Sequence, residues 1–112
     1  MIIRPVEPGE IAALAALARD TYAQAFGHSY APSDLAAILG GDLSDDNLRA
    51  AMSEDVFLAA VTEGGLVGFV QFGAAGAATP TVENGDQELR RLYVRPDWQN
   101  RGVGRRLIEA AF

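Results

Sequence analysis

Hydrophobic positions in the first half of the chain recur with two different periods. Residues 2–6 are mostly apolar and predict a short strand. From Glu10 onward the apolar positions return every three or four residues, which predicts a helix that ends at Gly27. Two shorter helical patterns follow, and Ser33 and Ser44 stand where they can cap them.

The middle of the chain has the pattern of strands. Residues 56–62 are nearly all apolar, as expected for a strand that is covered on both faces. Residues 63–65 read Glu-Gly-Gly and predict a hairpin turn, from which residues 66–72 return as the second strand. Residues 73–86 are small, polar and rich in turn formers, so we expect a mobile surface loop there.

The last part of the chain predicts one more strand, over residues 87–95, and a final helix over residues 102–112. The predicted order is therefore β-α-α-α-β-β-β-α. There is no internal repeat and no linker-like segment. We expect a single α+β domain that extends over residues 1–112.

Composition excludes several classes of protein and site. The hydrophobic fraction of 49% is ample for a core, and no apolar run approaches the ~20 residues of a membrane span. The N-terminal residues lack the order of a signal peptide, so a soluble cytoplasmic protein is expected, with no membrane partner. The chain has no cysteine. Disulfides, thiolate nucleophiles and zinc–thiolate centres are thereby excluded, and no metal is expected.

Charge is distributed unevenly along the chain. All nine basic residues are arginines, and six of them follow residue 86 against three acids, which gives that segment a net charge of +3. The first 86 residues carry twelve acids and three arginines, a net charge of −9. An overall charge of −6 argues against nucleic acid as a partner. The local positive charge suits a small polyphosphate, and the alternative is a basic surface helix without a ligand.

The arginines surround a turn, Gln99–Gly104, between the last predicted strand and the last predicted helix. Backbone N–H groups and the helix dipole at such a helix start stabilise an anion. Gly102 and Gly104 would let a phosphate approach these amides, because glycine has no Cβ. The P-loop pattern is excluded, since the chain has no lysine. The dinucleotide pattern GxGxxG also fails, because Leu107 stands at its third glycine.

A third pattern does fit. The run Gln99-Asn100-Arg101-Gly102-Val103-Gly104 matches Q/R-x-x-G-x-G/A, the signature of the GCN5-related N-acetyltransferases (GNAT). The longer segment ELRRLYVRPDWQNRGVGRRLIEAAF resembles the family's fourth strand, pyrophosphate loop and third helix without a gap. Further upstream, TYAQAFGHSYAPSDLAAIL resembles the branch of PaiA-type polyamine acetyltransferases. The resemblance implies a mixed, mainly antiparallel sheet with flanking helices.

The resemblance also implies a function and a cofactor site. It predicts an N-acetyltransferase that uses acetyl-CoA as co-substrate and acetylates a primary amine of a small molecule, such as a polyamine, or of a peptide. The backbone of Leu92, Tyr93 and Val94 would pair with the pantetheine arm. The pyrophosphate would lie on the amides of Gln99, Asn100, Arg101, Gly102, Val103, Gly104 and Arg105.

Glu88 is the candidate catalytic residue. It coincides with the position of the general base in some family members, and a partly buried carboxylate beside the acetyl group could take a proton from the acceptor ammonium. An ordinary surface role is the alternative, with Glu88 paired to a neighbouring arginine across the sheet. None of the three tyrosines fills the position of the general acid that is usual in the family.

The family's fifth strand and the elements after it have no counterpart in the sequence. We therefore expect a chain truncated after the last helix, either an enzyme fragment or a CoA-binding or dimerising remnant without turnover. A homodimer is expected because the strand at residues 87–95 would keep an open edge. The Val103, Leu107 and Ala111 stripe of the last helix would also lack part of its cover.

Overall fold

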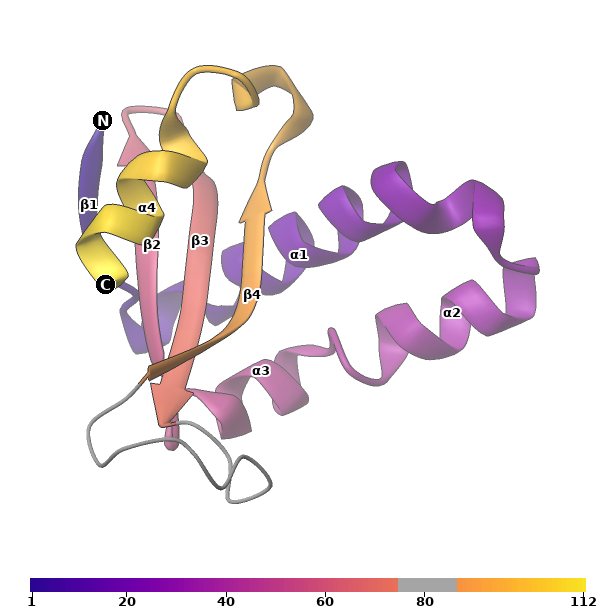
Figure 1. Ribbon diagram of the computed structural model, residues 1–112. Helices are drawn as coiled ribbons and strands as arrows, with labels where there is room; N and C mark the ends of the chain where they lie inside the picture. The colour runs from indigo at the N-terminus through magenta and orange to yellow at the C-terminus, as the bar shows by residue number, and fades with distance from the viewer. Residues whose placement is uncertain (75–86) are drawn as a thin grey trace.

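In the part of the chain that the structure describes, a four-stranded antiparallel sheet with helices on both faces forms the frame of the protein (Figure 1). The computed structural model describes residues 1–74 and 87–112. The strands lie in the order β1-β2-β3-β4, with bounds β1 (Ile2–Pro5), β2 (Val56–Thr62), β3 (Gly65–Ala74) and β4 (Gln87–Val94). The helices are α1 (Ile11–Phe26), α2 (Pro32–Gly40), α3 (Asp45–Ala51) and α4 (Val103–Ala111).

This order of elements confirms the predicted α+β class and the sequence β-α-α-α-β-β-β-α. Two details of the prediction were wrong. The strand β3 continues through residues 73 and 74, which were assigned to a loop, because they pair with β4. Ser33 does not cap α2, since the helix begins at Pro32 after Ala31. The rest of the expected loop, residues 75–86, lies outside the described residues.

Each face of the sheet carries its own hydrophobic cluster. On one face, α1 and α3 cover Phe57 and Phe69, whose rings stack with centroids 5.9 Å apart. On the other face, α4 covers Val70. Because central strands are buried on both sides, β2 and β3 read as continuous apolar runs in the sequence. In the part of the chain that the structure describes, no helix is long and apolar enough to cross a bilayer.

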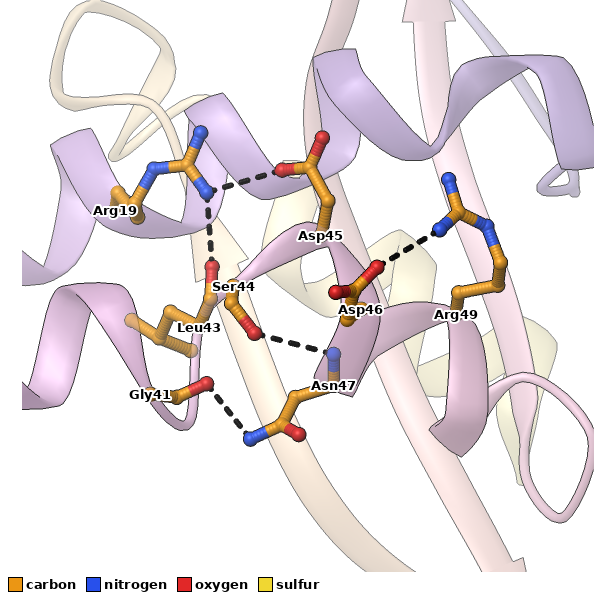
Figure 2. Close-up of polar contacts among 8 residues, drawn as sticks. All are labelled: Arg19, Gly41, Leu43, Ser44, Asp45, Asp46, Asn47 and Arg49. Atoms are coloured by element: carbon orange, nitrogen blue, oxygen red, sulfur yellow. Dashed lines mark hydrogen bonds and ion pairs between the residues drawn. The ribbon is translucent and has the colours of Figure 1, made fainter.

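Polar contacts join α1 to the start of α3 (Figure 2). The Arg19 guanidinium donates to the Leu43 carbonyl at 3.0 Å and to the Asp45 carboxylate at 3.1 Å. As predicted, Ser44 caps α3: its hydroxyl accepts a hydrogen bond from the Asn47 N–H at 3.1 Å. These contacts hold the short helix α3 against α1 immediately before the chain enters the sheet.

A second polar contact fixes the entry into α1. Arg4 of β1 forms a forked pair with the Glu10 carboxylate, at 2.7 and 2.8 Å. The same carboxylate accepts the Glu7 N–H at 2.9 Å. Both interactions favour the ionised form, and they lower the pKa of Glu10 to about 2. The first strand and the first helix are therefore tied together by charge-assisted hydrogen bonds.

The helix α4 approaches β3 closely because residue 68 has no side chain. A Cβ on Gly68 would lie 2.9 Å from the Tyr93 carbonyl oxygen and 3.4 Å from carbons of Val103 and Leu107. Val103 and Leu107 are buried, with 2% and 0% of each residue exposed. Gly68 thus sets how near the last helix lies to the strands beside it.

We expect Gly68→Ala to lower the free energy of unfolding by about 1–3 kcal/mol, because the added methyl group overpacks the contact between α4 and β3. Urea denaturation would measure the change. Gly9→Ala is the matched control, since a Cβ there meets nothing within 4 Å. Equal stabilities of the two variants would contradict the proposed role of Gly68.

Candidate functional site

The strand β4 has one open side among the strands that the structure describes, because it is the last in the order β1-β2-β3-β4. The Arg95 N–H donates to the Val67 carbonyl at 2.8 Å and so points toward β3. Backbone groups alternate in direction along an antiparallel strand. The N–H and C=O groups of Leu92 and Val94 are therefore directed to the open side, while those of Tyr93 are directed toward β3.

Side chains hold β4 in place from both faces of the sheet. Leu92 and Val94 pack on the cluster beneath α4, and Tyr93 packs on the cluster beneath α1. The Tyr93 ring meets Phe69 edge-on at 5.4 Å, and burial raises the pKa of the Tyr93 hydroxyl. The residues at the open edge therefore belong to a strand that is packed on both faces, which suits a binding site.

The chain leaves β4 through a short 3-10 helix, Pro96–Trp98, and a tight turn. Two residues of the turn have left-handed backbone conformations: Asn100 at φ 63° and Gly102 at φ 81°. The Gln99 side chain donates to the Val94 carbonyl at 3.0 Å. This bond ties the turn to the end of β4 and occupies one of the carbonyls on the open side.

The N-terminus of α4 presents backbone amides that the helix does not use. Its first hydrogen bond runs from the Arg106 N–H to the Gly102 carbonyl, at 3.0 Å. The N–H groups of Val103, Gly104 and Arg105 precede it and have no partner within the helix. Gly102, the N-cap residue, supplies no side-chain cap. With the dipole of a nine-residue helix behind them, these amides suit an anion.

A cleft of about 350 Å³ lies at this point. Six of the seven residues predicted to bind the pyrophosphate line it together: Gln99, Asn100, Gly102, Val103, Gly104 and Arg105. The seventh, Arg101, instead stacks over the Trp98 ring at 4.9 Å. Trp98 and Val94 complete the lining. Sequence reasoning did not identify Trp98 as part of the site, and the arginine three positions after it, Arg101, was the available signal.

The two glycines of the turn have different structural roles. Gly102 needs its positive φ of 81°, which a residue with a side chain adopts only with strain. A Cβ on Gly104 would lie 3.8 Å from Leu92 and Val94 side-chain carbons, in ordinary contact with the sheet. A Cβ at residue 104 would thus contact β4, and the expectation that Gly104 keeps space for a phosphate stays a prediction.

Glu88 lies near the start of β4, opposite Gly73 of β3. Its side chain is 50% exposed, and Oε2 lies 3.1 Å from a terminal nitrogen of Arg90. An arginine partner was the alternative interpretation of Glu88, although this arginine belongs to the same strand and does not lie across the sheet. The role of Glu88 as a base stays a prediction.

Sequence reasoning did not identify a second, larger cleft of about 640 Å³. It lies between α1, the turn from β2 to β3, and the residues that follow β4. Three polar residues of α1 contribute to its lining: Asp20, Thr21 and Gln24. These three residues fall on one face of the predicted helix, and this was the only sign of the cleft in the sequence. In the described ranges, residues 1–74 and 87–112, no group of three or more His, Asp or Glu side chains could hold a metal ion.

Residues 53–112, more than half of the chain, match the family model described as the acetyltransferase (GNAT) domain. The chain belongs to the GNAT acetyltransferase family. An uncharacterised N-acetyltransferase from Lactobacillus delbrueckii subsp. lactis, encoded in the pepI 3′ region, is 30% identical over 98 residues. The alignment covers 86% of this chain and 57% of that relative. This GNAT chain thus spans little more than half of the relative's length.

Solved GNAT structures share the fold. The PaiA N-acetyltransferase of Thermoplasma acidophilum, in complex with coenzyme A, superposes with a TM-score of 0.82 at 20% identity, over 98% of this chain and 68% of that one. A GCN5-related N-acetyltransferase from Rhodopseudomonas palustris superposes with a TM-score of 0.73 at 26% identity, over 98% of this chain and 62% of that one. A GNAT acetyltransferase from Brucella melitensis, in complex with acetyl-CoA, superposes with a TM-score of 0.70 at 23% identity, over 98% of this chain and 64% of that one. These similarities confirm the GNAT-like architecture.

Proposed function

We propose that the chain binds acetyl-CoA and transfers its acetyl group to a primary amine of a small molecule, such as a polyamine, or of a peptide. One observation carries the proposal: the uncapped N-terminus of α4 opens into a cleft directly beside the open edge of β4. A helix start binds phosphates and a strand edge binds an extended chain of amides. Coenzyme A contains both parts, joined in one molecule.

In this proposal the two ends of the cofactor contact different elements. The amides of Val103, Gly104 and Arg105 hold the pyrophosphate, and the α4 dipole stabilises its charge. The open-side groups of Leu92 and the N–H of Val94 pair with the pantetheine amides. The Val94 carbonyl is taken by Gln99, which limits this pairing to three backbone groups.

The acetyl thioester of acetyl-CoA supplies the transferred group. The acceptor amine must lose a proton before it can attack the thioester. In this proposal the carboxylate of Glu88 accepts that proton, directly or through water. The acid-rich first 86 residues, with twelve acids against three arginines, favour a cationic acceptor. The PaiA-like run in α1 and α2 supports a polyamine within this class.

A second candidate function is CoA binding without turnover. It is favoured by the open side of β4 among the described strands. Incubation with acetyl-CoA and a panel of amines separates the two candidates. Release of free thiol supports the transferase, whereas binding without release supports the second candidate.

We expect Gly102→Val to raise the Kd for coenzyme A about tenfold or more, because a left-handed φ costs a residue with a side chain roughly 1–2 kcal/mol and distorts the start of α4. Calorimetric titration measures the change. Gly104→Ala is the control and should stay within about twofold, since its methyl group contacts the sheet. Unchanged affinity in Gly102→Val would remove the turn as the pyrophosphate site.

We expect Glu88→Gln to slow acetyl transfer more at neutral pH than at high pH. At high pH the acceptor is already a free amine and needs no base. The measurement is thiol release as a function of pH, with Glu63→Gln in the exposed turn from β2 to β3 as the control. If Glu88→Gln and the parent chain had parallel pH profiles, Glu88 would have only a structural role.

We also propose a homodimer. Val103 and Leu107, which were predicted to take part in the dimer interface, are buried in the core and cannot do so. Two other apolar residues lie on the same face of the sheet and are exposed: Phe112 at 59% and Leu89 at 45%. Phe112→Asp should halve the mass seen by light scattering, and Phe26→Asp, on α1, should not. A monomer mass for the parent chain at tens of micromolar would refute the dimer.

A further inference from the structure

We infer that Asp55 is a positioning residue for the cofactor strand. Its carboxylate reaches across β3, over Gly73, and holds Arg90, the extra residue of a bulge in β4. The bulge sets the course of β4 immediately before its open edge at Leu92 and Val94. The inference rests on the proposed function, because that edge is where we place the pantetheine arm.

The bulge is visible in the pairing of β3 with β4. Gln71 pairs with Arg91, but the next residue, Phe72, pairs with Leu89, so Arg90 has no opposite residue in β3. A bulge bends its strand and increases the local twist. The direction in which β4 continues therefore depends on how Arg90 is held.

Gly73 makes room for the contact across β3. A Cβ on Gly73 would collide with an Asp55 carboxylate oxygen and would lie 2.9 Å from its carboxyl carbon. It would also lie 3.3 Å from a terminal nitrogen of Arg90. The Asp55 side chain is only 11% exposed. The carboxylate and the guanidinium thus meet in the space that a side chain at residue 73 would occupy.

Three acceptors fix the orientation of the Arg90 guanidinium. Nε donates to Asp55 Oδ2 at 3.1 Å, and Nη2 donates to the Ala74 carbonyl at 2.9 Å. Nη1 lies 3.1 Å from Glu88 Oε2. The hydrogen bond with Asp55 is the largest cause that raises the pKa of Arg90. A planar fork held at each of its nitrogens has little freedom to rotate.

Through Gln71, Asp55 is also connected to Arg91, the residue after the bulge. The Gln71 side chain is buried, with 2% of the residue exposed. Its Nε2 donates to Asp55 Oδ2 at 2.8 Å, and its Oε1 accepts from Arg91 at 2.7 Å. Arg90 and Arg91 are therefore both tied to one carboxylate, the first directly and the second through a buried amide.

A general effect on stability and a local effect on β4 can be told apart with two ligands. The pyrophosphate end of coenzyme A would lie on α4, which is anchored over Gly68 at the other end of the sheet. Only the pantetheine arm would contact the β4 edge. A change confined to β4 should therefore weaken coenzyme A but not 3′-phospho-ADP, which keeps the pyrophosphate and lacks the arm.

The test uses Asp55→Asn, which removes the charge and keeps the size. We expect its Kd for coenzyme A to rise about tenfold and its Kd for 3′-phospho-ADP to stay within about twofold of the parent chain. Gly73→Ala should give the same selective loss, because its methyl group displaces the intact carboxylate. Asp46→Asn is the matched control, since that side chain is 95% exposed and pairs only with Arg49 in the described residues.

Amide chemical shifts of the free protein provide a second measurement. Asp55→Asn should move the Leu92 and Val94 resonances and leave those of Val103 to Arg105 in place. Equal weakening of both ligands, no weakening of either, or unmoved β4 resonances would overturn the inference. If the parent chain bound no coenzyme A, the proposed function would fail, and the chemical shifts would still decide whether Asp55 positions β4.

Discussion

The packing of Val103 and Leu107 over Gly68 is the contact on which the candidate site depends. It fixes α4 on β3, and so places the start of the helix at the end of β4. A ligand that spans both elements needs them at a constant separation, because a misplacement of about 1 Å at a supporting contact can weaken a site severely. The missing side chain at residue 68 is thus a requirement of the site as well as of the core.

A second constraint acts at the opposite end of β4. There Asp55, Gln71 and Arg90 form a polar network within the sheet, whereas the end at Gly68 is held by apolar packing. A buried network of this kind is costly when one partner is lost, because the remaining polar groups stay desolvated. At each end a glycine of β3 leaves room for a neighbouring group: Gly68 for the side chains of α4, and Gly73 for the Asp55 carboxylate.

Local patterns in the sequence predicted most of this fold. Apolar runs with turn residues between them located β2 and β3, and Ser44 marked the start of α3. The run from Gln99 to Gly104 identified the turn, since positive φ angles and an uncapped helix start need particular residues at fixed spacing.

Contacts between distant residues could not be predicted in this way. Asp55 and Arg90 are 35 positions apart, and their pairing depends on the register of three strands. The bulge at Arg90 is likewise a property of register. Register also decides that the backbone N–H and C=O groups of Tyr93 point toward β3, while those of Leu92 and Val94 point to the open side. A lone glutamine, Gln71, interrupts the apolar run of β3, but nothing in the sequence identifies its partners.

The central claim is that the α4 N-terminus and the open edge of β4 form one surface for one ligand. Hydrogen–deuterium exchange with and without coenzyme A tests it most directly. The account predicts slower exchange at the amides of Val103 to Arg105 and, together with them, at Leu92 and Val94, with no change in α2. Exchange that is unchanged at both elements, or slowed only in α2, would contradict it.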